Sequence, residues 1–298
     1  MSAPNTIPIA ARHRASGASF WKSLTRNRLA TAGVVVLGVI ALMALAAPLL
    51  SPYDPEVVNI RARLQPPAWM SGGSMANLLG TDSVGRDILS RIIFGARMSM
   101  FVAVCTVLIG GSVGSVLGVI AGYFRGRTET VIMRLVDIQL AFPSILLAVA
   151  LMAILGPSVR NVILVLSLST WSSFCRVARG ETLSVCEQEF VAAARVIGAG
   201  NRRVILRHVV PNMISPIIVV ASFAVATAII NEASLSFLGV GVPPSTPTWG
   251  GMLGEGRNYL RLAWWVSTLP GVALMLAVYS VNVLGDWLRD YLDPRLVD

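Results

Sequence analysis

The residues able to do chemistry are few in this chain, and they form no convincing set for catalysis. Lys22 is the only lysine, and no G-x-x-x-x-G-K-S/T sequence precedes it, so the loop that cradles phosphates in ATPases is missing. The chain also lacks H-E-x-x-H and C-x-x-C sequences, and its cysteines and histidines are scattered. We therefore predict no catalytic residue, no metal site and no disulfide.

Charged residues gather instead in residues 189–211, EFVAAARVIGAGNRRVILRHVVP. Apolar residues in this stretch recur at i, i+3, i+4 and i+7 and predict a short helix with one small apolar face, formed by Phe190, Ala193, Ala194 and Ile197. A face built largely of alanine can lie close in a groove of another protein. An ordinary amphipathic surface helix has the same pattern, so both interpretations stay open on the helix alone.

A break follows this helix. Gly198 comes directly after the last periodic residue, where a left-handed cap needs no side chain. Asn201 is expected to cap a second short helix, which we predict to end before Pro211. The arginines on both sides of the break are expected to keep this loop out of the hydrocarbon.

The elements that must position this loop are long apolar spans. Of the 298 residues, 55% are hydrophobic and 13% are charged, whereas an average soluble domain is about 25% charged. Several runs exceed about 18 residues with almost no charge, which predicts an all-α polytopic membrane protein with about six transmembrane helices. We place these at residues 29–50, 98–123, 130–155, 162–177, 213–230 and 264–284.

The spans divide the chain into two parts, a basic tail at residues 1–28 and a transmembrane domain at 29–298. The domain is expected to contain an outer excursion at 51–96, a cytoplasmic loop at 178–212 and an outer loop at 231–263. The net charge of +9 comes from arginines that mostly border the spans. This placement indicates orientation in a lipid bilayer with both termini inside, and not nucleic-acid binding. The first span lacks a cleavage site and is interpreted as retained.

Four glycines recur every fourth residue in the second span, at Gly110, Gly114, Gly118 and Gly122. Repeated G-x-x-x-G lets helix backbones approach closely, so this row predicts a helix-packing face. The sequence leaves open whether the packing partner lies in this chain or in a neighbouring subunit.

Two places, one in the third span and one in the outer loop, are candidates for a translocation path or gate. Arg134 and Asp137 lie three residues apart in the third span and are expected to pair with each other, although intramembrane charges also mark wet cavities. Pro143 predicts a kink in the same span. Residues 232–249 are too rich in proline and glycine for one regular helix, which favours a lining of the outer gate. The candidate path residues are Asp137, Asn231, Glu232, Ser234 and Phe237.

Residues 189–211 resemble the coupling loop of ABC-importer permeases, which has Glu-Ala-Ala, a glycine six positions after that glutamate, and a hydrophobic-proline ending. The alanines, the glycine and the proline are matched here, but Ala192 stands at the position of the glutamate. The resemblance assigns contact with an ATPase to residues within 187–211. These are Glu189, Phe190, Val191, Ala192, Ala193, Ala194, Arg195, Gly198, Ala199, Arg203 and Pro211.

Further segments are similar to the dipeptide/oligopeptide permease family. They are GTDSVGRD before the second span, MRLVDIQLAFPS in the third, and the two ends NRLA and LGDWLRDYLDPRL. The chain is identified as a C-type permease subunit with the type I importer (MetI-like) fold. In the first segment, Asp82 or Ser83 is expected to cap a short helix carrying Arg86, Asp87 and Arg91. These charges either contact a binding protein or partner permease, or satisfy one another.

The resemblance implies a non-catalytic subunit of a bacterial inner-membrane importer for di- and oligopeptides. Expected partners are a second homologous permease, an external substrate-binding protein and two cytoplasmic ATPases that carry the ATP and magnesium. Closure of the ATPases is expected to move the 187–197 helix and rock the spans. Similar machinery serves glutathione or chelated nickel, so those substrates stay open. An ion-gradient-driven transporter or a membrane scaffold is a less favoured alternative.

Overall fold

The computed structural model describes residues 17–292, and within this range the chain is helical and forms no β-sheet. Five helices are long and apolar enough to cross a membrane, and a bent pair of helices passes the same test of length and composition when taken together, which confirms the expected all-α polytopic fold. The five are α2 (Arg28–Leu45), α4 (Ile88–Phe124), α7 (Val159–Cys186), the continuous segment Asn201–Phe237, and α12 (Trp265–Leu292). The bent pair is α5 (Gly126–Leu140) with α6 (Ser144–Leu155).

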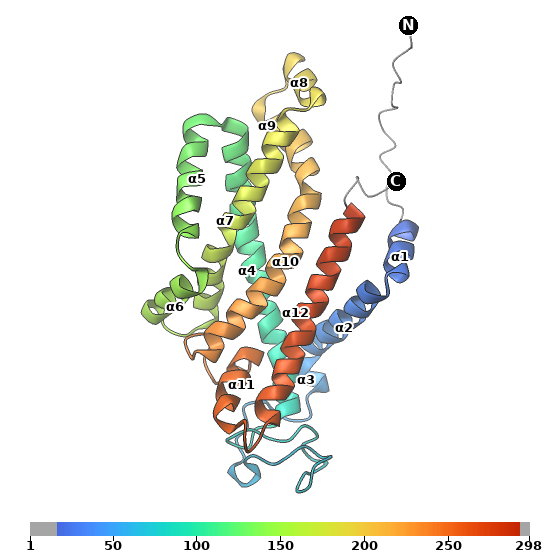
Figure 1. The fold of residues 1–298 in the computed structure, drawn as a ribbon, viewed down its shortest axis with the longest axis vertical. Coiled ribbons are helices and arrows are strands. Elements are labelled where there is room, and N and C mark those ends of the chain that lie inside the picture. Colours follow the sequence, from blue (N-terminus) through green and yellow to red (C-terminus); the bar gives the residue numbers. More distant parts are fainter. Residues whose placement is uncertain (1–16, 293–298) are drawn as a thin grey trace.

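Shorter elements lie at the two ends of this bundle (Figure 1). At the end drawn uppermost are α8 (Glu189–Val196) and α9 (Asn201–Val204), and α1 (Gly17–Arg26) lies lower, beside the last turns of α12. At the opposite end are α3 (Ala47–Leu50), η1 (Ile60–Ala62), α11 (Trp249–Gly256) and η3 (Arg257–Tyr259). The part of the predicted basic tail at residues 1–16 lies outside the described residues, and α1 forms the remainder.

The centre of the bundle is the pair α4 and α7, which lie against each other through the glycine row. A Cβ atom added at Gly114 would lie 2.1 Å from the carbonyl oxygen of Trp171, and one at Gly118 would lie 2.4 Å from that of Cys175. Gly110 and Gly122 face Ser167 and Arg179 in the same way. The packing partner left open by the sequence is therefore a helix of the same chain.

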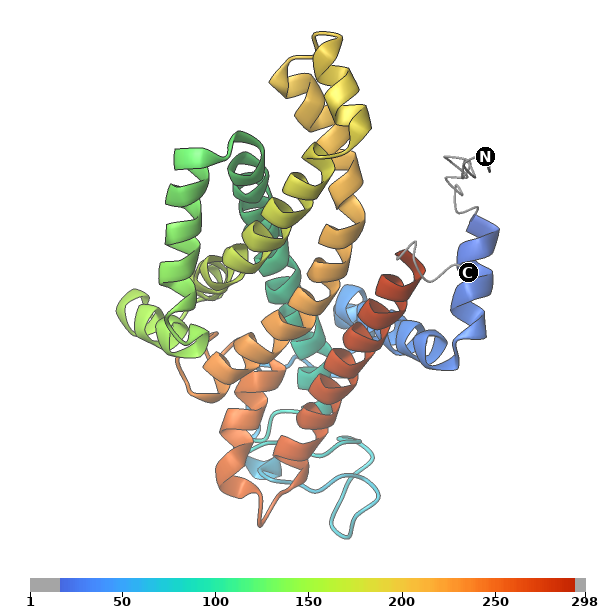
Figure 2. The same ribbon diagram turned by 45° about the horizontal axis from the view of Figure 1, so that its top comes forward.

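The third predicted span is broken and not merely kinked. Helices α5 and α6 meet at 86°, as the green and yellow-green ribbons of Figure 2 show. Pro143 stands at the N-cap of α6 with an extended ψ of 121°, so the backbone leaves the helical conformation one residue before α6 begins. Proline supplies no N–H to the preceding turn and disfavours helix in the residue before it, which explains the sharp change of direction.

The prediction that a short helix ends before Pro211 is wrong, because the chain passes through this proline without leaving the helix. α9 continues into η2, a π-helix at Ile205–Val209, and then into α10 (Val210–Phe237). The backbone N–H of Val210 bonds to the carbonyl of Ile205, five residues earlier. The wider π-turn makes room for the proline ring, whose missing N–H falls at the first turn of α10.

Two further element predictions need correction at the opposite end. Asp82 and Ser83 cap no helix; Asp87 is the N-cap, with its carboxylate accepting from Ser90 N, and α4 then runs unbroken to Phe124. The predicted irregular stretch 232–249 is shorter than expected, because α10 continues to Phe237 and α11 begins at Trp249. A Cβ at Gly250 would lie 2.3 Å from Ala233 Cα, so glycine lets α11 pack directly on α10.

Candidate functional site

Helix α8 has one face buried against the bundle and another exposed. Val191 is 0% and Ala194 is 7% exposed, and Val191 belongs to a cluster with residues of α4, α7, α9, η2 and α10: Val119, Ala178, Val185, Val204, Val209 and Met213. The exposed side carries Phe190 and, at its end, Val196 and Ile197, which are 87% and 85% exposed. The apolar residues of α8 thus lie on two sides of the helix. The buried side anchors α8 to the bundle, and the exposed side, with Phe190, Val196 and Ile197, is called the free side of α8.

The break after α8 is a Schellman motif. Gly198 has φ +85°, which confirms the left-handed residue expected there. The N–H of Ala199 bonds to the carbonyl of Ala194 at 3.0 Å, and that of Gly198 to the carbonyl of Arg195 at 3.0 Å. These bonds satisfy the last carbonyls of α8 and fix the direction in which the chain leaves it.

Asn201 does not cap the second helix, contrary to expectation. Gly200 is the N-cap of α9, without a side-chain bond, and Asn201 Oδ1 accepts a hydrogen bond from the hydroxyl of Tyr123 at 3.0 Å. The guanidinium of Arg195 lies 5.5 Å from the centre of the same tyrosine ring. Tyr123 therefore joins the end of α4 to both halves of the loop, a role that sequence reasoning missed.

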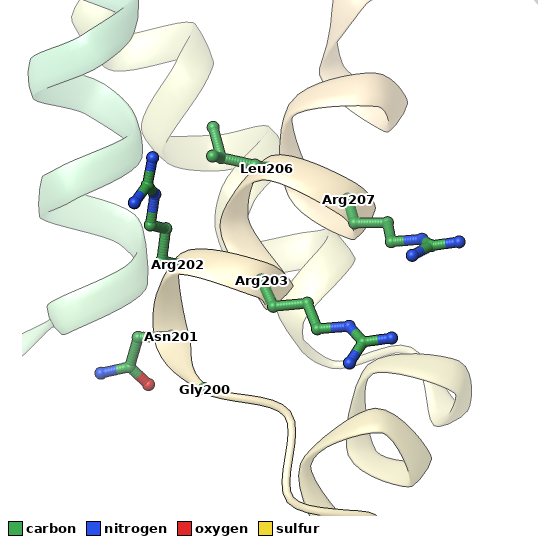
Figure 3. Close-up of a pocket in the computed structure, with 6 residues that line it drawn as sticks. All are labelled: Gly200, Asn201, Arg202, Arg203, Leu206 and Arg207. Carbon is green, nitrogen blue, oxygen red and sulfur yellow. The ribbon is translucent and has the colours of Figure 1, made fainter.

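Beside this break lies an open hollow of about 640 Å³ with a basic rim. Figure 3 shows Arg203 and Arg207 pointing in one direction and Arg202 pointing to the other side of the chain. All three are exposed, and none forms an ion pair within residues 17–292. The loop therefore presents uncompensated positive charge next to the exposed apolar residues of α8.

The expected pair of Arg134 with Asp137 is wrong. Asp137 pairs instead with Arg176 of α7 at 3.0 Å, and both side chains are 54% exposed. One turn nearer the α4–α5 connection, Arg179 Nε donates to Glu129 at 2.7 Å. Arg134 and Asp137 share a helix face, but α7 passes close enough to offer an arginine from a second helix, a contact that local spacing does not reveal.

The charges expected on the outer face form a mostly buried network. Asp82 accepts from Arg86 at 2.6 Å and also from Arg91, and both arginines reach Glu255 of α11 at 2.6 and 2.7 Å. The Arg91 and Asp82 side chains are only 3% and 2% exposed. The self-satisfied alternative therefore describes these residues, and Glu255 is the partner that sequence reasoning missed.

The pKa of Asp82 follows from this network. Burial alone raises the pKa, but the guanidinium groups of Arg91 and Arg86, with the backbone N–H groups of Arg86 and Val84, outweigh it and hold the pKa below the ordinary 3.8. Stabilisation from the charged carboxylate is therefore complete above that ordinary value and is lost as the pH falls through the lowered pKa.

We expect Asp82→Asn to destabilise the subunit by about 3 kcal/mol, because the buried Arg91 then keeps only Glu255 as a counter-charge. The measurement is the midpoint of thermal unfolding in detergent at neutral pH. Glu56→Gln is the matched control, since Glu56 is exposed and has no ion pair within the described part of the chain. Equal midpoints for the two variants contradict the prediction.

The candidate gate residues lie on two sides of α10. Glu232 is fully buried and accepts from the hydroxyls of Ser99 at 3.0 Å and Ser236 at 2.8 Å, so it joins α10 to α4. Asn231 and Ser234 are half-buried on the other side of the helix, and Phe237 is exposed, with the Arg257 guanidinium 5.7 Å from its ring centre. The structure therefore separates Glu232 from the other three, and Asp137 lies apart on α5.

No metal or redox chemistry is indicated by the grouping of side chains. Within residues 17–292 no three of the His, Cys, Asp and Glu side chains come together as metal ligands. Cys105, Cys175 and Cys186 are unpaired. The geometry instead offers an exposed loop suited to a partner protein at one end of the bundle and a rigid charged network at the other.

Comparison with known families agrees with this geometry. The model described as binding-protein-dependent transport system inner membrane component matches residues 114–298. A second model, the N-terminal TM domain of oligopeptide transport permease C, matches residues 17–67. Together they cover both the first span and the half of the chain that contains α8 and α9.

Individual proteins match over nearly the whole chain. The di/tripeptide transport system permease protein DppC of Pseudomonas aeruginosa is 43% identical, over 93% of this chain and 91% of that protein. The dipeptide transport system permease protein DppC of Escherichia coli is 45% identical, over 93% and 92%. The inward-facing MetNI methionine ABC transporter matches in structure with a TM-score of 0.57, covering 69% of this chain and 98% of that one at 18% identity.

Proposed function

Since the chain belongs to the family of binding-protein-dependent transport system inner membrane components, we propose that it is a permease subunit that imports short peptides in an ATP-driven complex. The two DppC relatives, named for di/tripeptide and dipeptide transport, support the substrate class. The inward-facing methionine transporter supports the fold. This chain supplies one part of the path, and a second permease supplies the rest.

The observation that carries the proposal is the free side of α8. Val196 and Ile197 are apolar, almost fully exposed and held rigidly at the tip of a capped helix. Apolar side chains in that position are suited to burial in a groove of a partner protein. The partner in this proposal is one of two ATPases, which carry the ATP and magnesium that this chain does not hold.

The positive charge of the loop indicates the charge expected on the ATPase surface that receives it. Ala192 is exposed where the family motif has glutamate, and Arg195, Arg203 and Arg207 leave the loop basic. The ATPase groove that receives α8 is therefore expected to be acidic at its rim, since complementary charge guides docking and excludes mismatched partners.

The anchoring of α8 explains how a force on the loop reaches the spans. Val191 belongs to one buried cluster that also contains Val119 of α4, Val185 of α7 and Met213 of α10. Close-packed clusters transmit displacement because they have little free volume. When the ATPases close, α8 moves as a rigid body and carries the inner ends of three spans with it, which opens the peptide path on one side at a time.

This assignment also sets the orientation. α8 lies at the top of Figure 1, and α12 runs upward toward the same side of the bundle, where α1 lies beside its last turns. If α8 meets an ATPase, that end is cytoplasmic, and both termini lie inside. The opposite end, with residues 51–87 and α11, then faces the substrate-binding protein across the bacterial inner membrane.

The test is ATP hydrolysis by the complete complex in liposomes, formed from this subunit, its partner permease, the two ATPases and the binding protein. We expect a dipeptide mixture to stimulate hydrolysis and to be taken up. Stimulation by glutathione or chelated nickel, with no response to dipeptides, would agree with an ATP-driven importer but overturn the proposed substrate class. Uptake that continues without ATP would overturn the importer itself.

A further inference from the structure

A second hollow, of about 570 Å³, lies where α1 meets the last turns of α12. Phe20 of α1 packs edge-on against Trp287 at 4.9 Å and Tyr291 at 5.4 Å between ring centres, and Leu24 is buried beside them. The hollow is formed by the polar side of this junction. Its lining residues are Ser23, Arg26, Asn27, Arg28, Leu29, Trp287, Asp290 and Tyr291.

The hollow is lined by positive and negative side chains that form no ion pairs within the described residues. Arg26 and Arg28 are exposed, as is Asp290, and none of the three forms an ion pair among residues 17–292. Two guanidinium groups beside one carboxylate suit a ligand that has a phosphate and an ammonium. A ligand with several negative charges fits less well, because Asp290 repels it.

Two buried donors in the same lining also lack acceptors. The indole N–H of Trp287, a residue that is 5% exposed, and the hydroxyl of Tyr291 have no hydrogen-bond partner in the described structure. Buried polar groups are normally paired, so an unpaired N–H next to two arginines indicates a missing acceptor. A phosphate oxygen is such an acceptor.

An apolar and largely exposed helix begins at the hollow. Leu29 lines the hollow and is 62% exposed, and Val35 and Leu42, farther along the same membrane-spanning helix α2, are also exposed. A polar hollow at the end of a span that continues into exposed hydrocarbon-facing residues matches a lipid, with its headgroup in the hollow and its acyl chains beside the helix.

We propose that this hollow binds a membrane phospholipid of the ethanolamine type, with the phosphate at Arg26 and Arg28 and the ammonium at Asp290. The lipid holds α1 against α12 and so fixes the N-terminal helix at the membrane surface. This inference is independent of the peptide substrate and of the ATPase contact.

The test uses the full-length subunit with its partner permease, released from detergent for native mass spectrometry. Wild type is expected to retain one more phospholipid per chain than Arg26→Gln/Arg28→Gln. The matched control is Arg61→Gln/Arg63→Gln, which makes the same charge change at exposed arginines near the opposite end of the bundle. Equal retention by the two double variants overturns the proposal.

Three further measurements identify the ligand. Trp287→Phe keeps an aromatic side chain and removes the N–H donor, so we expect weaker retention, whereas Trp69→Phe at an exposed tryptophan leaves retention unchanged. In mixed micelles, phosphatidylethanolamine is retained at least several-fold over phosphatidylglycerol, and Asp290→Asn removes that preference. Preferential retention of phosphatidylglycerol, or displacement of the lipid by excess inorganic phosphate, overturns the assignment.

Discussion

Gly114→Val is expected to prevent the subunit from folding to a stable bundle. A Cβ at this position would lie 2.1 Å from the Trp171 carbonyl oxygen and 2.8 Å from Phe174 Cβ, and valine adds two more carbon atoms. The obstacle is the backbone of α7, which cannot rotate away, so α4 and α7 must separate. Overpacking costs about 1–3 kcal/mol where side chains can adjust, and we expect more than 3 kcal/mol here.

The measurement is the yield and thermal midpoint of the purified subunit. Gly38→Val and Gly180→Val are controls, because nothing lies within 4 Å of a Cβ at either helical glycine. Both controls are expected to fold, with changes within about 1 kcal/mol. Gly111→Ala is expected to be intermediate, since the neighbouring atoms there belong to the Phe174 ring, 3.2 Å away. A Gly114→Val subunit as stable as the controls contradicts the packing argument.

Val196→Asp/Ile197→Asp is expected to abolish transport while leaving the subunit folded. The two side chains are 87% and 85% exposed, so they contribute little to the stability of the isolated chain. If α8 enters a groove on an ATPase, each apolar side chain adds about 1.5–3 kcal/mol to that contact, and a buried carboxylate opposes it further. Loss of both is expected to weaken assembly by at least about 100-fold.

Assembly is measured by co-purification of the ATPases, and transport by peptide uptake in liposomes. Thr128→Asp is the control, an exposed position at the start of α5, near the same end of the bundle. We expect the control to assemble normally and the double variant to keep a wild-type unfolding midpoint. A double variant that assembles and transports at the wild-type rate shows that the free side of α8 is not the docking surface.

The sequence predicted the number and type of spans well, because hydrophobic length is a property of each segment alone. The glycine row at Gly110–Gly122 similarly predicted a close helix contact, and Gly198 predicted a left-handed cap. Each of these features depends on residues within one continuous segment of the chain. The family and the peptide-permease function were also predicted and are supported by the comparisons.

Predictions failed where the answer depends on a second element. Arg134 and Asp137 have ideal helical spacing, but Arg176 arrives from α7 and pairs with the aspartate. In the sequence, Asp82, Arg86 and Arg91 form a local group of charges. Glu255, more than 160 positions farther along the chain, accepts hydrogen bonds from both arginines and completes the network. No local pattern predicts such partners, since each long-range contact depends on the packing of whole helices.

The π-turn at Ile205–Val209 has a consequence for how motion passes from the loop to the membrane. An α-helix advances by about 100° per residue, so a single added residue moves every following side chain by that angle around the axis. The faces of α9 and α10 are therefore out of phase, although the helix axis is continuous. If the wide turn tightens to an α-turn when α8 is pushed, α10 rotates about its own axis. Movement of the loop would then turn α10 about its own axis in addition to displacing its inner end.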